Sequence, residues 1–411
     1  MKCRHCQAQL DHTFLDLGTA PPSNAYLRPN QLHAAEVWLP LRLLVCHHCW
    51  LVQTEDFTGR ESLFDEDYAY FSSYSSTWLR HAEQYVNAMQ ERFGLHSRHC
   101  VVEVAANDGY LLQYVKRAAI PCYGIEPTAS TAAAARDRGI EIISDFFGQA
   151  LAQSLVDQGR QADLIAANNV LAHVPDINDF VAGFTTLLKP TGVVTFEFPH
   201  LLRMVQGLQF DTAYHEHYSY LSLTAVQRIF AANGLTVFDV EELPTHGGSL
   251  RVFAQRTSSG VQMIQQSVAE LLAVEDQAGI SDVSFYTGFQ EKAEKIKYDV
   301  LRYLIDCKRK GLRVAAYGAA AKGNTLLNFA GIRSDLVSYV VDANPNKQDK
   351  FLPGSRIPIR NRSALLTDSP DIILILPWNL SDEIRRDLDE FCIWKPKFVV
   401  AIPEIHEFDR H

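Results

Sequence analysis

The sequence predicts an α/β protein whose main body is an open, mostly parallel sheet covered by helices. Between residues 70 and 255, apolar β-branched runs alternate with helical stretches, which is the pattern of such a sheet. A second unit with the same alternation begins at Arg313, and two C-x-x-C pairs lie within the first fifty residues. We therefore expect four segments: a cysteine-rich module at 1–66, a central domain at 67–258, a helical connector at 259–310 and a C-terminal domain at 311–411.

Composition favours a folded protein with small-molecule partners. Hydrophobic residues make up 47% of the 411 positions and charged residues 21%, which is enough apolar material for real cores. The formal charge is −10 and no Lys/Arg block stands out, so neither nucleic acid nor an anionic membrane is an expected partner. The start of the chain, MKCRHC, lacks the apolar stretch of a signal peptide. We expect a cytoplasmic protein with reduced cysteines and, given its large internal interfaces, a monomer.

The two C-x-x-C pairs predict a zinc site. Each pair supplies two thiolates from one tight turn, and four thiolates suit tetrahedral zinc. An ion with four protein ligands has no open position, so its role would be structural. A redox or disulfide role is the alternative, and His5, His47 or His48 could replace a sulfur. The expected zinc ligands are Cys3, Cys6, Cys46 and Cys49.

A cofactor loop is expected early in the central domain. A strand at 100–104 is followed by the small-residue turn 105–109 and a helix, so a ligand can approach the backbone at the end of the strand. The next strand, 122–125, ends on Glu126, where an acid can accept hydrogen bonds from both ribose hydroxyls of a nucleoside cofactor. An NAD-dependent oxidoreductase would fit this geometry too, and in a generic doubly wound fold Glu126 would merely be exposed.

The order of four motifs resembles that of class I methyltransferases, which are Rossmann-like. These motifs are EVAANDGYL, IEP, SDFF and NNVLAHVPD. The resemblance implies S-adenosylmethionine as cofactor: the first loop would hold its amino-acid part, Glu126 its ribose, and the pair Asp145 and Phe146 its adenine. Ala105 and Asn107 stand where glycines are usual, which disfavours an oxidoreductase more than a methyltransferase. The cofactor-binding residues expected on this basis are Glu103, Ala105, Asn107, Gly109, Glu126, Asp145, Phe146 and Asn168.

The end of the central domain should complete its sheet. After a strand at 193–198, the last helix is expected to begin at Ser222, a plausible N-cap. Strands at 237–242 and 250–255 would then pair through a turn that carries His246. That histidine could contact a substrate or be incidental to the turn.

A loop rich in titratable groups, 214–220, precedes this helix and reads YHEHYSY. Loops at this edge of the sheet overhang the cofactor, so acid/base groups placed there can reach a substrate. Three interpretations compete for His215 and His217: a metal-binding H-x-H pair with Glu216, structural histidines bonded to loop carbonyls, or a general base.

The four-cysteine module, a methyltransferase core with Y-H-E-H-Y and the segment GAAAKGNTLLN together resemble the ketosugar C-methyltransferases of deoxysugar biosynthesis. The resemblance spans nearly the whole chain. It implies a nucleotide-linked 4-keto-deoxysugar as substrate, a dTDP-sugar among the possibilities, methylated most often at carbon 3. The implied catalytic residues are His217 as base, Glu216, Tyr214, His173 and Tyr68. The run 68–74 resembles the lid of that family, which makes Tyr70 and Tyr74 substrate contacts.

This chemistry has a physical rationale. Carbon methylation needs a carbanion, and a ketone beside the target carbon makes its proton removable by His217, so that an enolate forms. Glu216 would orient the imidazole and stabilise its charged form. The alternatives are an O- or N-methyltransferase, which needs no enolate, and a sugar-nucleotide binding protein without activity.

The C-terminal part should contain one long amphipathic helix at 281–310 and then a small Rossmann-like unit. Its strands are expected at 313–317, 336–341, 371–376 and 397–402, with a small-residue turn at 318–323 before a helix at 324–329. Amides at that helix start, with Lys322, would attract phosphate. By resemblance this unit helps to hold the nucleotide diphosphate, with Lys322 as a contact; a scaffold domain whose loop binds nothing is the alternative.

Overall fold

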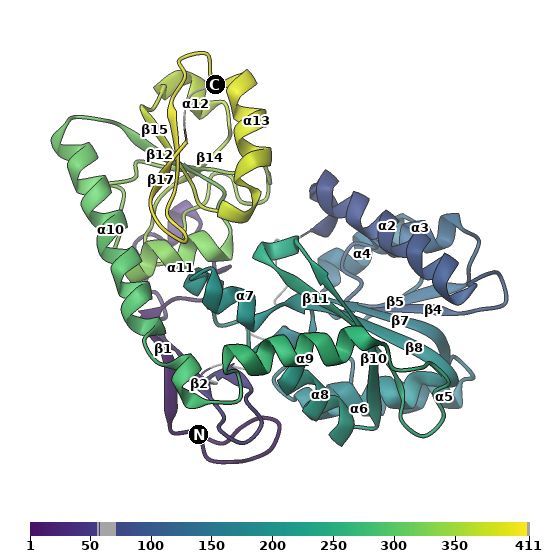
Figure 1. Ribbon diagram of the computed structural model, residues 1–411. Helices are drawn as coiled ribbons and strands as arrows, with labels where there is room; N and C mark the ends of the chain where they lie inside the picture. Colours follow the sequence, from purple (N-terminus) through teal and green to yellow (C-terminus); the bar gives the residue numbers. More distant parts are fainter. Residues whose placement is uncertain (56, 58–70, 409–411) are drawn as a thin grey trace.

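The computed structural model describes residues 1–55, 57 and 71–408. Within these ranges the chain forms three sheets, which contain four, seven and six strands. In Figure 1 the seven-stranded sheet lies on one side and the six-stranded sheet on the other, with the N-terminal strands below the latter. None of the helices in the described ranges is long and apolar enough to cross a membrane.

The N-terminal sheet is antiparallel and is completed by a strand from the central domain. Its order is β1 (His12–Ala20), β2 (Leu39–Val45), β3 (Val52–Thr54) and β9 (Ser219–Tyr220). Val52 pairs with Tyr220 and Gln53 with Ser219. A short 3-10 turn, η1 (Pro29–Gln31), lies in the long loop between β1 and β2. The loop expected to carry the catalytic groups is therefore bonded directly to the N-terminal module.

The central sheet has the order β10-β11-β8-β7-β4-β5-β6, with β11 antiparallel to both of its neighbours. Its strands are β4 (Val101–Val104), β5 (Cys122–Ile125), β6 (Ile142–Ile143), β7 (Ala162–Asn168), β8 (Leu188–Pro199), β10 (Leu235–Leu243) and β11 (Ser249–Arg256). The five parallel strands bring their carboxyl ends to one edge, where open α/β sheets bind ligands.

Helices cover both faces of this sheet because its central strands are apolar on both sides. One face packs against α2 (Ser76–Phe93), α3 (Leu112–Arg117) and α4 (Ala129–Asp137). The other packs against α5 (Gln149–Asp157), α6 (Ile177–Leu187), α8 (Leu223–Ala232) and α9 (Gln266–Ala278). Alternation along β4 shows the division: Val101 faces the first layer, and Val102 and Val104 face the second. Ser222 caps α8, as predicted, because its side chain accepts a hydrogen bond from the amide of Ala225.

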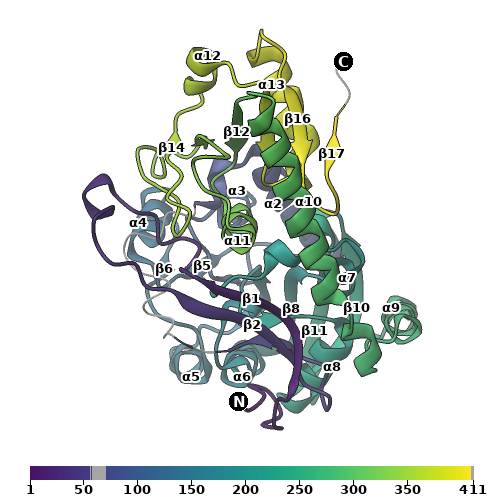
Figure 2. The same ribbon diagram turned by 90° about the vertical axis from the view of Figure 1, so that its left-hand side faces the viewer.

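The helix expected at 281–310 does not run unbroken from residue 281 and begins only at residue 289. The structure instead has α9, a 3-10 turn η6 (Val283–Tyr286) and α10 (Phe289–Arg309). Gly279 and Gly288 adopt left-handed φ angles of 89° and 79°, which end α9 and precede α10. Figure 2 shows α10 running from β1 along the C-terminal domain. At its start, Phe289 stacks on Phe14 with ring centroids 4.7 Å apart.

The C-terminal sheet has the order β14-β13-β12-β15-β16-β17 and is parallel except for β17. Its elements are β12 (Val314–Tyr317), α11 (Ala321–Ala330), β13 (Val340–Val341), β14 (Ile359–Arg360), α12 (Ala364–Asp368), β15 (Ile372–Ile375), η7 (Trp378–Leu380), α13 (Ser381–Phe391), β16 (Lys397–Val400) and β17 (His406–Glu407). The strand expected at 336–341 is shorter than predicted, because the amides of Leu336 and Val337 both bond to the carbonyl of Arg333 in a turn.

One apolar core joins three parts of the chain that lie far apart in sequence. It contains Leu15 and Leu43 of the N-terminal sheet, Phe210 of the central domain, and Leu326 and Val340 of the C-terminal domain. The segment between β8 and β9 contributes α7 (Leu201–Gln206) and η4 (Phe210–Thr212) to this core. This arrangement places the loop 213–218 where all three sheets approach one another.

Candidate active site

The four cysteines of the two C-x-x-C pairs come together in the N-terminal module. The Sγ atoms of Cys3 and Cys49 are 3.5 Å apart, as are those of Cys6 and Cys46, and all four lie within 4.8 Å of one another. Sulfurs about 2.3 Å from a common tetrahedral zinc would have a similar spacing. His5 takes no part, because its Nδ1 bonds to the side-chain oxygen of Asn178. The donor set therefore fits a structural zinc with four thiolate ligands.

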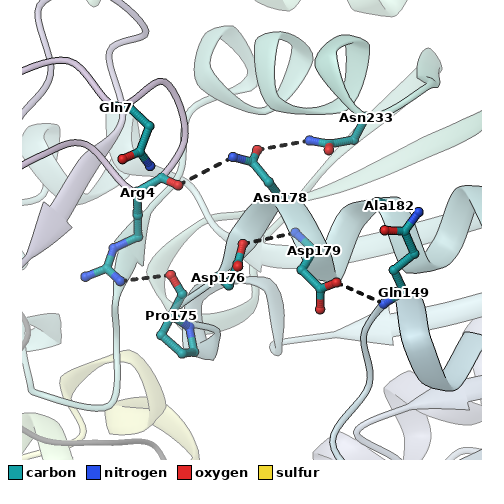
Figure 3. Close-up of a pocket in the computed structure, with 9 residues that line it drawn as sticks. All are labelled: Arg4, Gln7, Gln149, Pro175, Asp176, Asn178, Asp179, Ala182 and Asn233. Carbon is teal, nitrogen blue, oxygen red and sulfur yellow. Dashed lines mark hydrogen bonds between the residues drawn. The ribbon is translucent and has the colours of Figure 1, made fainter.

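This module is attached to the central domain by Arg4, which lies between Cys3 and Cys6. Its guanidinium donates to the carbonyls of Pro175, at 3.0 Å, and Thr54, at 2.8 Å. Asn178 adds a second link because its amide donates to the backbone of His5. Figure 3 shows the bond from Arg4 to Pro175, and a bond from Asn178 to the backbone carbonyl of Arg4, along a cavity of about 620 Å³.

The polar groups of this cavity serve the protein itself. Asp176 accepts the amide of Asp179 at the start of α6, and Asp179 accepts the amide of Gln149 at the start of α5. None of the predicted site residues lines the cavity, whose walls are Arg4, Gln7, Gln149, Pro175, Asp176, Asn178, Asp179, Ala182 and Asn233. We interpret the cavity as a gap at the boundary between the N-terminal module and the central domain, and we place the active site elsewhere.

The expected cofactor loop follows β4 at the carboxyl edge of the central sheet. Ala105 and Asn107, which replace the usual glycines, have φ angles of 61° and 48°. They therefore adopt the left-handed conformation that glycine takes without strain. Gly109, with φ of 76°, leaves no room for a side chain, because a Cβ would lie 2.4 Å from Ile140. The backbone of the loop is thus tightly determined even without a glycine-rich sequence.

Glu126 is buried beside this loop, so the alternative of a merely exposed acid is wrong. Its two carboxylate oxygens accept the amides of Asn107 and Thr128, both at 2.9 Å. Burial raises the pKa of Glu126, and these amide bonds oppose that shift. The carboxylate is therefore held rigidly at the loop with lone pairs left for hydroxyl donors of a ligand.

Two further predicted residues place unpartnered polar atoms in the same region. Among the described residues, both carboxylate oxygens of buried Glu103 and the side-chain oxygen of Asn168 lack a hydrogen-bond partner of good geometry. Burial raises the pKa of Glu103 well above the ordinary carboxyl value. Such groups are costly unless a ligand or water completes them, and the ammonium group of an amino-acid ligand would do so.

The outer part of this region is open. Asp145 is exposed, and its carboxylate accepts the amide of Phe146, which is half-buried. Tyr74 is 58% exposed, so the structure does not bring its side chain into an enclosed site. Tyr68 and Tyr70, the other predicted lid residues, lie outside the described residues.

The predicted base, His217, is buried with both ring nitrogens engaged. Its Nδ1 lies 3.0 Å from the carbonyl oxygen of Thr212, which can only accept, so Nδ1 carries the proton. Its Nε2 therefore accepts from the hydroxyl of Tyr214, at 2.7 Å. Burial, with lesser contributions from His173, Lys322 and His246, holds the pKa of His217 well below the usual histidine value. The imidazole is neutral near pH 7, as a base must be.

His173 lies beside His217, as predicted, with ring centroids 4.6 Å apart. Its Nδ1 donates to the carbonyl of Glu216, at 2.8 Å, and burial lowers the pKa of His173 to about 4. The two imidazoles are therefore both neutral, which avoids repulsion between two buried cations.

The role predicted for Glu216 is wrong in this geometry. Its carboxylate accepts from the side chain of Asn24 at 3.2 Å, and the carbonyl of Thr212 orients the imidazole of His217 instead. His215 bonds through Nε2 to the carbonyl of Pro40, which makes it a structural histidine. Within the described part of the chain, no group of possible metal ligands includes His215 or His217, so the metal-pair interpretation has no support.

His246 and Lys322 meet across the boundary between the central and C-terminal domains. The amino group of Lys322 donates to the carbonyl of His246, at 3.3 Å, and to the side chain of Asn379, at 3.2 Å. Lys322 also lies over the ring of Trp378, 4.6 Å from its centroid. Burial lowers the pKa of His246 to about 4 and also lowers the pKa of Lys322. Because both groups act electrostatically on His217, they belong to its surroundings.

Sequence reasoning missed a buried ion pair near this site. His81 of α2 bonds to the carboxylate of Glu197 at the end of β8, with its Nε2 2.8 Å from the nearer oxygen. Glu197 also accepts from Arg251 and Thr245, both at 3.1 Å. Burial tends to raise the pKa of Glu197, but His81 and Arg251 outweigh it and the net shift is downward. The sequence did contain a signal for this ion pair, because Glu197 is a charged residue within the apolar run VVTFEFP.

Comparison with known proteins identifies the family. Three family models match successive parts of the chain: "Putative zinc binding domain" at residues 3–64, "Methyltransferase domain" at 78–240 and "C-methyltransferase C-terminal domain" at 244–403. C-methyltransferase NovU of Streptomyces niveus is 32% identical over 403 residues, which are 98% of this chain and 96% of that protein. The chain belongs to the C-methyltransferase family. The family predicted by resemblance is thereby confirmed, as are the class I fold and the S-adenosylmethionine-dependent methyltransferase activity.

Solved structures resemble only part of this C-methyltransferase. An S-adenosylmethionine-dependent methyltransferase from Clostridium acetobutylicum is 10% identical, with a TM-score of 0.35 over 43% of this chain and 92% of that chain. The 1,6-didemethyltoxoflavin-N1-methyltransferase of Burkholderia thailandensis is 15% identical, with a TM-score of 0.37 over 50% of this chain and 96% of that chain. The C-methyltransferase uses S-adenosylmethionine and carries a structural zinc in its four-cysteine module.

Replacing one zinc ligand should remove the metal. We expect wild-type protein to carry about one zinc per chain, and Cys46→Ser to carry almost none and to unfold at a lower temperature, because metal binding contributes folding free energy to so small a module. Elemental analysis of folded protein and thermal unfolding measure both effects. Cys100→Ser, at a half-buried thiol outside the module, is the control and should keep its zinc. Metal-free wild-type protein that is fully folded would contradict the assignment.

Proposed function

We propose that this C-methyltransferase methylates a nucleotide-diphosphate-linked 4-keto-deoxysugar at carbon 3, beside the ketone, through an enolate. The observation that carries the proposal is the state of His217: a buried, neutral imidazole with its proton on Nδ1 and its Nε2 lone pair directed at a tyrosine hydroxyl. In a family that methylates carbon, this is the form that a general base requires. The ketosugar itself is inferred from the resemblance of the sequence motifs.

In this proposal His217 acts through Nε2. Its lone pair takes the proton from the carbon beside the ketone, and the electrons of that C–H bond form the enolate double bond as the ketone oxygen becomes an oxyanion. Bound S-adenosylmethionine supplies the electrophilic methyl group. The carbonyl of Thr212 then stabilises the imidazolium through its bond to Nδ1, and the imidazolium releases its extra proton to solvent after the reaction.

Tyr214 is the proposed donor to the developing oxyanion. Its hydroxyl donates to Nε2 of His217 in the structure. Once Nε2 takes a proton it can no longer accept that bond, so the hydroxyl becomes available to another acceptor. An enolate oxygen beside the base would be that acceptor, and a donor already in place costs little reorganisation.

The cofactor side of the site is proposed from the loop geometry. Glu126 would accept from the two ribose hydroxyls, and Glu103 and Asn168, with their unpartnered oxygens, would meet the amino-acid part of the cofactor. The loop residues Ala105, Asn107 and Gly109 bring the backbone close, and exposed Asp145 and half-buried Phe146 would frame the adenine.

The substrate would lie between the central and C-terminal domains. Two of the three N–H donors of Lys322 bond to His246 and Asn379, which leaves one for a phosphate oxygen. No side chain caps the start of α11, so the first amides of this helix would be donors to a phosphate. The lid tyrosines Tyr68, Tyr70 and Tyr74 complete the proposed substrate contacts.

The proposal also includes a cellular setting. A zinc site of four thiolates requires reduced cysteines, which the cytoplasm maintains, so we place the enzyme there. We treat it as a monomer, because one apolar core already joins its N-terminal, central and C-terminal parts.

Replacing Glu126 should weaken cofactor binding. We expect Glu126→Gln to raise the dissociation constant of S-adenosylhomocysteine about tenfold to a hundredfold, the range for losing hydrogen bonds to a charged group. Isothermal titration calorimetry measures the change. Glu141→Gln, at an exposed carboxylate that precedes β6 at the opposite edge of the sheet, is the control and should bind as wild type does. Equal binding by Glu126→Gln and wild type would remove Glu126 from the ribose site.

Replacing His217 should abolish enolate formation while sparing the cofactor. With S-adenosylhomocysteine filling the cofactor site, wild-type enzyme should exchange the proton beside the ketone of a nucleotide-linked 4-ketosugar for deuterium, as followed by NMR. His217→Asn should show no exchange and an unchanged affinity for S-adenosylhomocysteine.

His215→Gln is the control for this experiment, because His215 lies two positions away and bonds only to a backbone carbonyl in the structure. It should retain exchange if circular dichroism shows it folded. Exchange by His217→Asn would remove His217 as the base, and no exchange by wild type with any ketosugar would point to O- or N-methylation.

The pH profile should show a displaced acid limb. His217 must be neutral to act, and its folded pKa lies well below the usual value of 6.5, so activity should persist as the pH falls through 6.5 and decline only at lower pH. Measurements of kcat/KM between pH 4.5 and 8, in steps of about half a pH unit, report this pKa of the free enzyme. An acid limb centred at or above 6.5 would contradict a buried histidine base.

A further inference from the structure

The segment 210–217, which we call the base segment, is held by the C-terminal domain at three points. Phe210 packs against Phe329 of α11, with ring centroids 5.4 Å apart. The indole N–H of Trp378 donates to the carboxylate of Asp211, at 2.8 Å, and the hydroxyl of Thr325 donates to the carbonyl of Ala213, at 2.8 Å. The C-terminal domain therefore contacts and holds the residues just before the base.

These contacts lie on both sides of the group that orients His217. The carbonyl of Thr212 accepts from Nδ1 of His217. It belongs to the peptide between Thr212 and Ala213, so the side chain of Asp211 is anchored before this peptide and the carbonyl of Ala213 after it. A planar peptide fixed at both ends keeps its carbonyl in one direction.

The contact between Asp211 and Trp378 places a carboxylate at this domain boundary. Asp211 is fully buried, and its second oxygen has no hydrogen-bond partner among the described residues. The ring of Trp378 lies under the amino group of Lys322, whose charge acts on Asp211. Loss of the indole N–H would leave a buried carboxylate without its side-chain donor. The free-energy cost of such an unsatisfied group is large enough to shift the backbone of the base segment.

We propose that Asp211 and Trp378 are positioning residues, through which docking of the C-terminal domain fixes the carbonyl of Thr212 and so keeps the proton of His217 on Nδ1. This inference rests on the proposed role of His217 as base. It means that the base is correctly oriented only while the domain that would hold the nucleotide is docked. Binding of the sugar nucleotide and readiness of the base are thereby coupled.

Trp378→Phe is the direct test, because it keeps most of the ring and removes the N–H. We expect kcat to fall about tenfold to a hundredfold, the size of effect produced by small misplacement of a catalytic group, with KM for S-adenosylmethionine unchanged. Trp394→Phe is the matched control: it removes an indole N–H from the same domain, one that donates to Pro370 at 2.8 Å away from the base segment. It should lower stability by a similar amount and leave kcat unaltered.

NMR of protein labelled with ¹⁵N-histidine supplies a readout that needs no substrate. The His217 signals, assigned by their loss in His217→Asn, should show the Nδ1-protonated form in wild type and Trp394→Phe, and a mixture of both tautomers in Trp378→Phe. Asp211→Asn keeps an oxygen that can accept from Trp378 and should retain more activity than Asp211→Ala.

An unchanged tautomer and kcat in Trp378→Phe, an equal loss in Trp394→Phe, or equal losses in Asp211→Asn and Asp211→Ala would each overturn the proposal. Failure of the proposed function is separately visible, because it would appear as absent exchange in wild-type enzyme while the tautomer signals stay readable.

Discussion

One hydrogen bond, from Nδ1 of His217 to the carbonyl of Thr212, is the constraint around which the site is built. It assigns the proton of the imidazole, and with it the nitrogen that can act as a base. The bond survives only if the chain around it is immobile. The N-terminal module and the C-terminal domain both contribute to that: Thr325 holds the carbonyl of Ala213, Asn24 holds the carboxylate of Glu216, and Thr54 of β3 donates to the carbonyl of His217 at 3.2 Å.

The flanking domains therefore do more than bind zinc and substrate. The four-cysteine cluster orders a module too small for a core of its own, and that module supplies Thr54 and Asn24. The C-terminal domain supplies Thr325 and Trp378. A catalytic loop on a methyltransferase sheet becomes rigid through neighbours on both sides, which is how a loop can hold a base with the precision of a helix or strand.

Local patterns explain what the sequence could predict. Two C-x-x-C pairs, an acid at the end of the second strand and a serine before an apolar helix each act through near neighbours, so the cysteine cluster, the position of Glu126 at the loop after β4 and the cap at Ser222 could be predicted. Gly288 delays the start of a helix that periodicity alone predicted to begin at residue 281. Thr212 was missed because it acts through its backbone carbonyl, which any residue would offer. This carbonyl orients the imidazole of His217, the role that was predicted for Glu216. Asp211 and Trp378 lie 167 positions apart, and no local pattern links them.

The pairing of β3 with β9 limits how this protein can be recombined. The outer strand of the zinc module's sheet, Ser219–Tyr220, is encoded far from the module and directly after the base. A module cut out at residue 66 would expose the edge of β3, with unpaired backbone groups that favour association with other chains. Exchange of N-terminal modules between relatives would join a foreign β3 to a resident β9, so a recombined chain has to preserve this strand pairing beside the base.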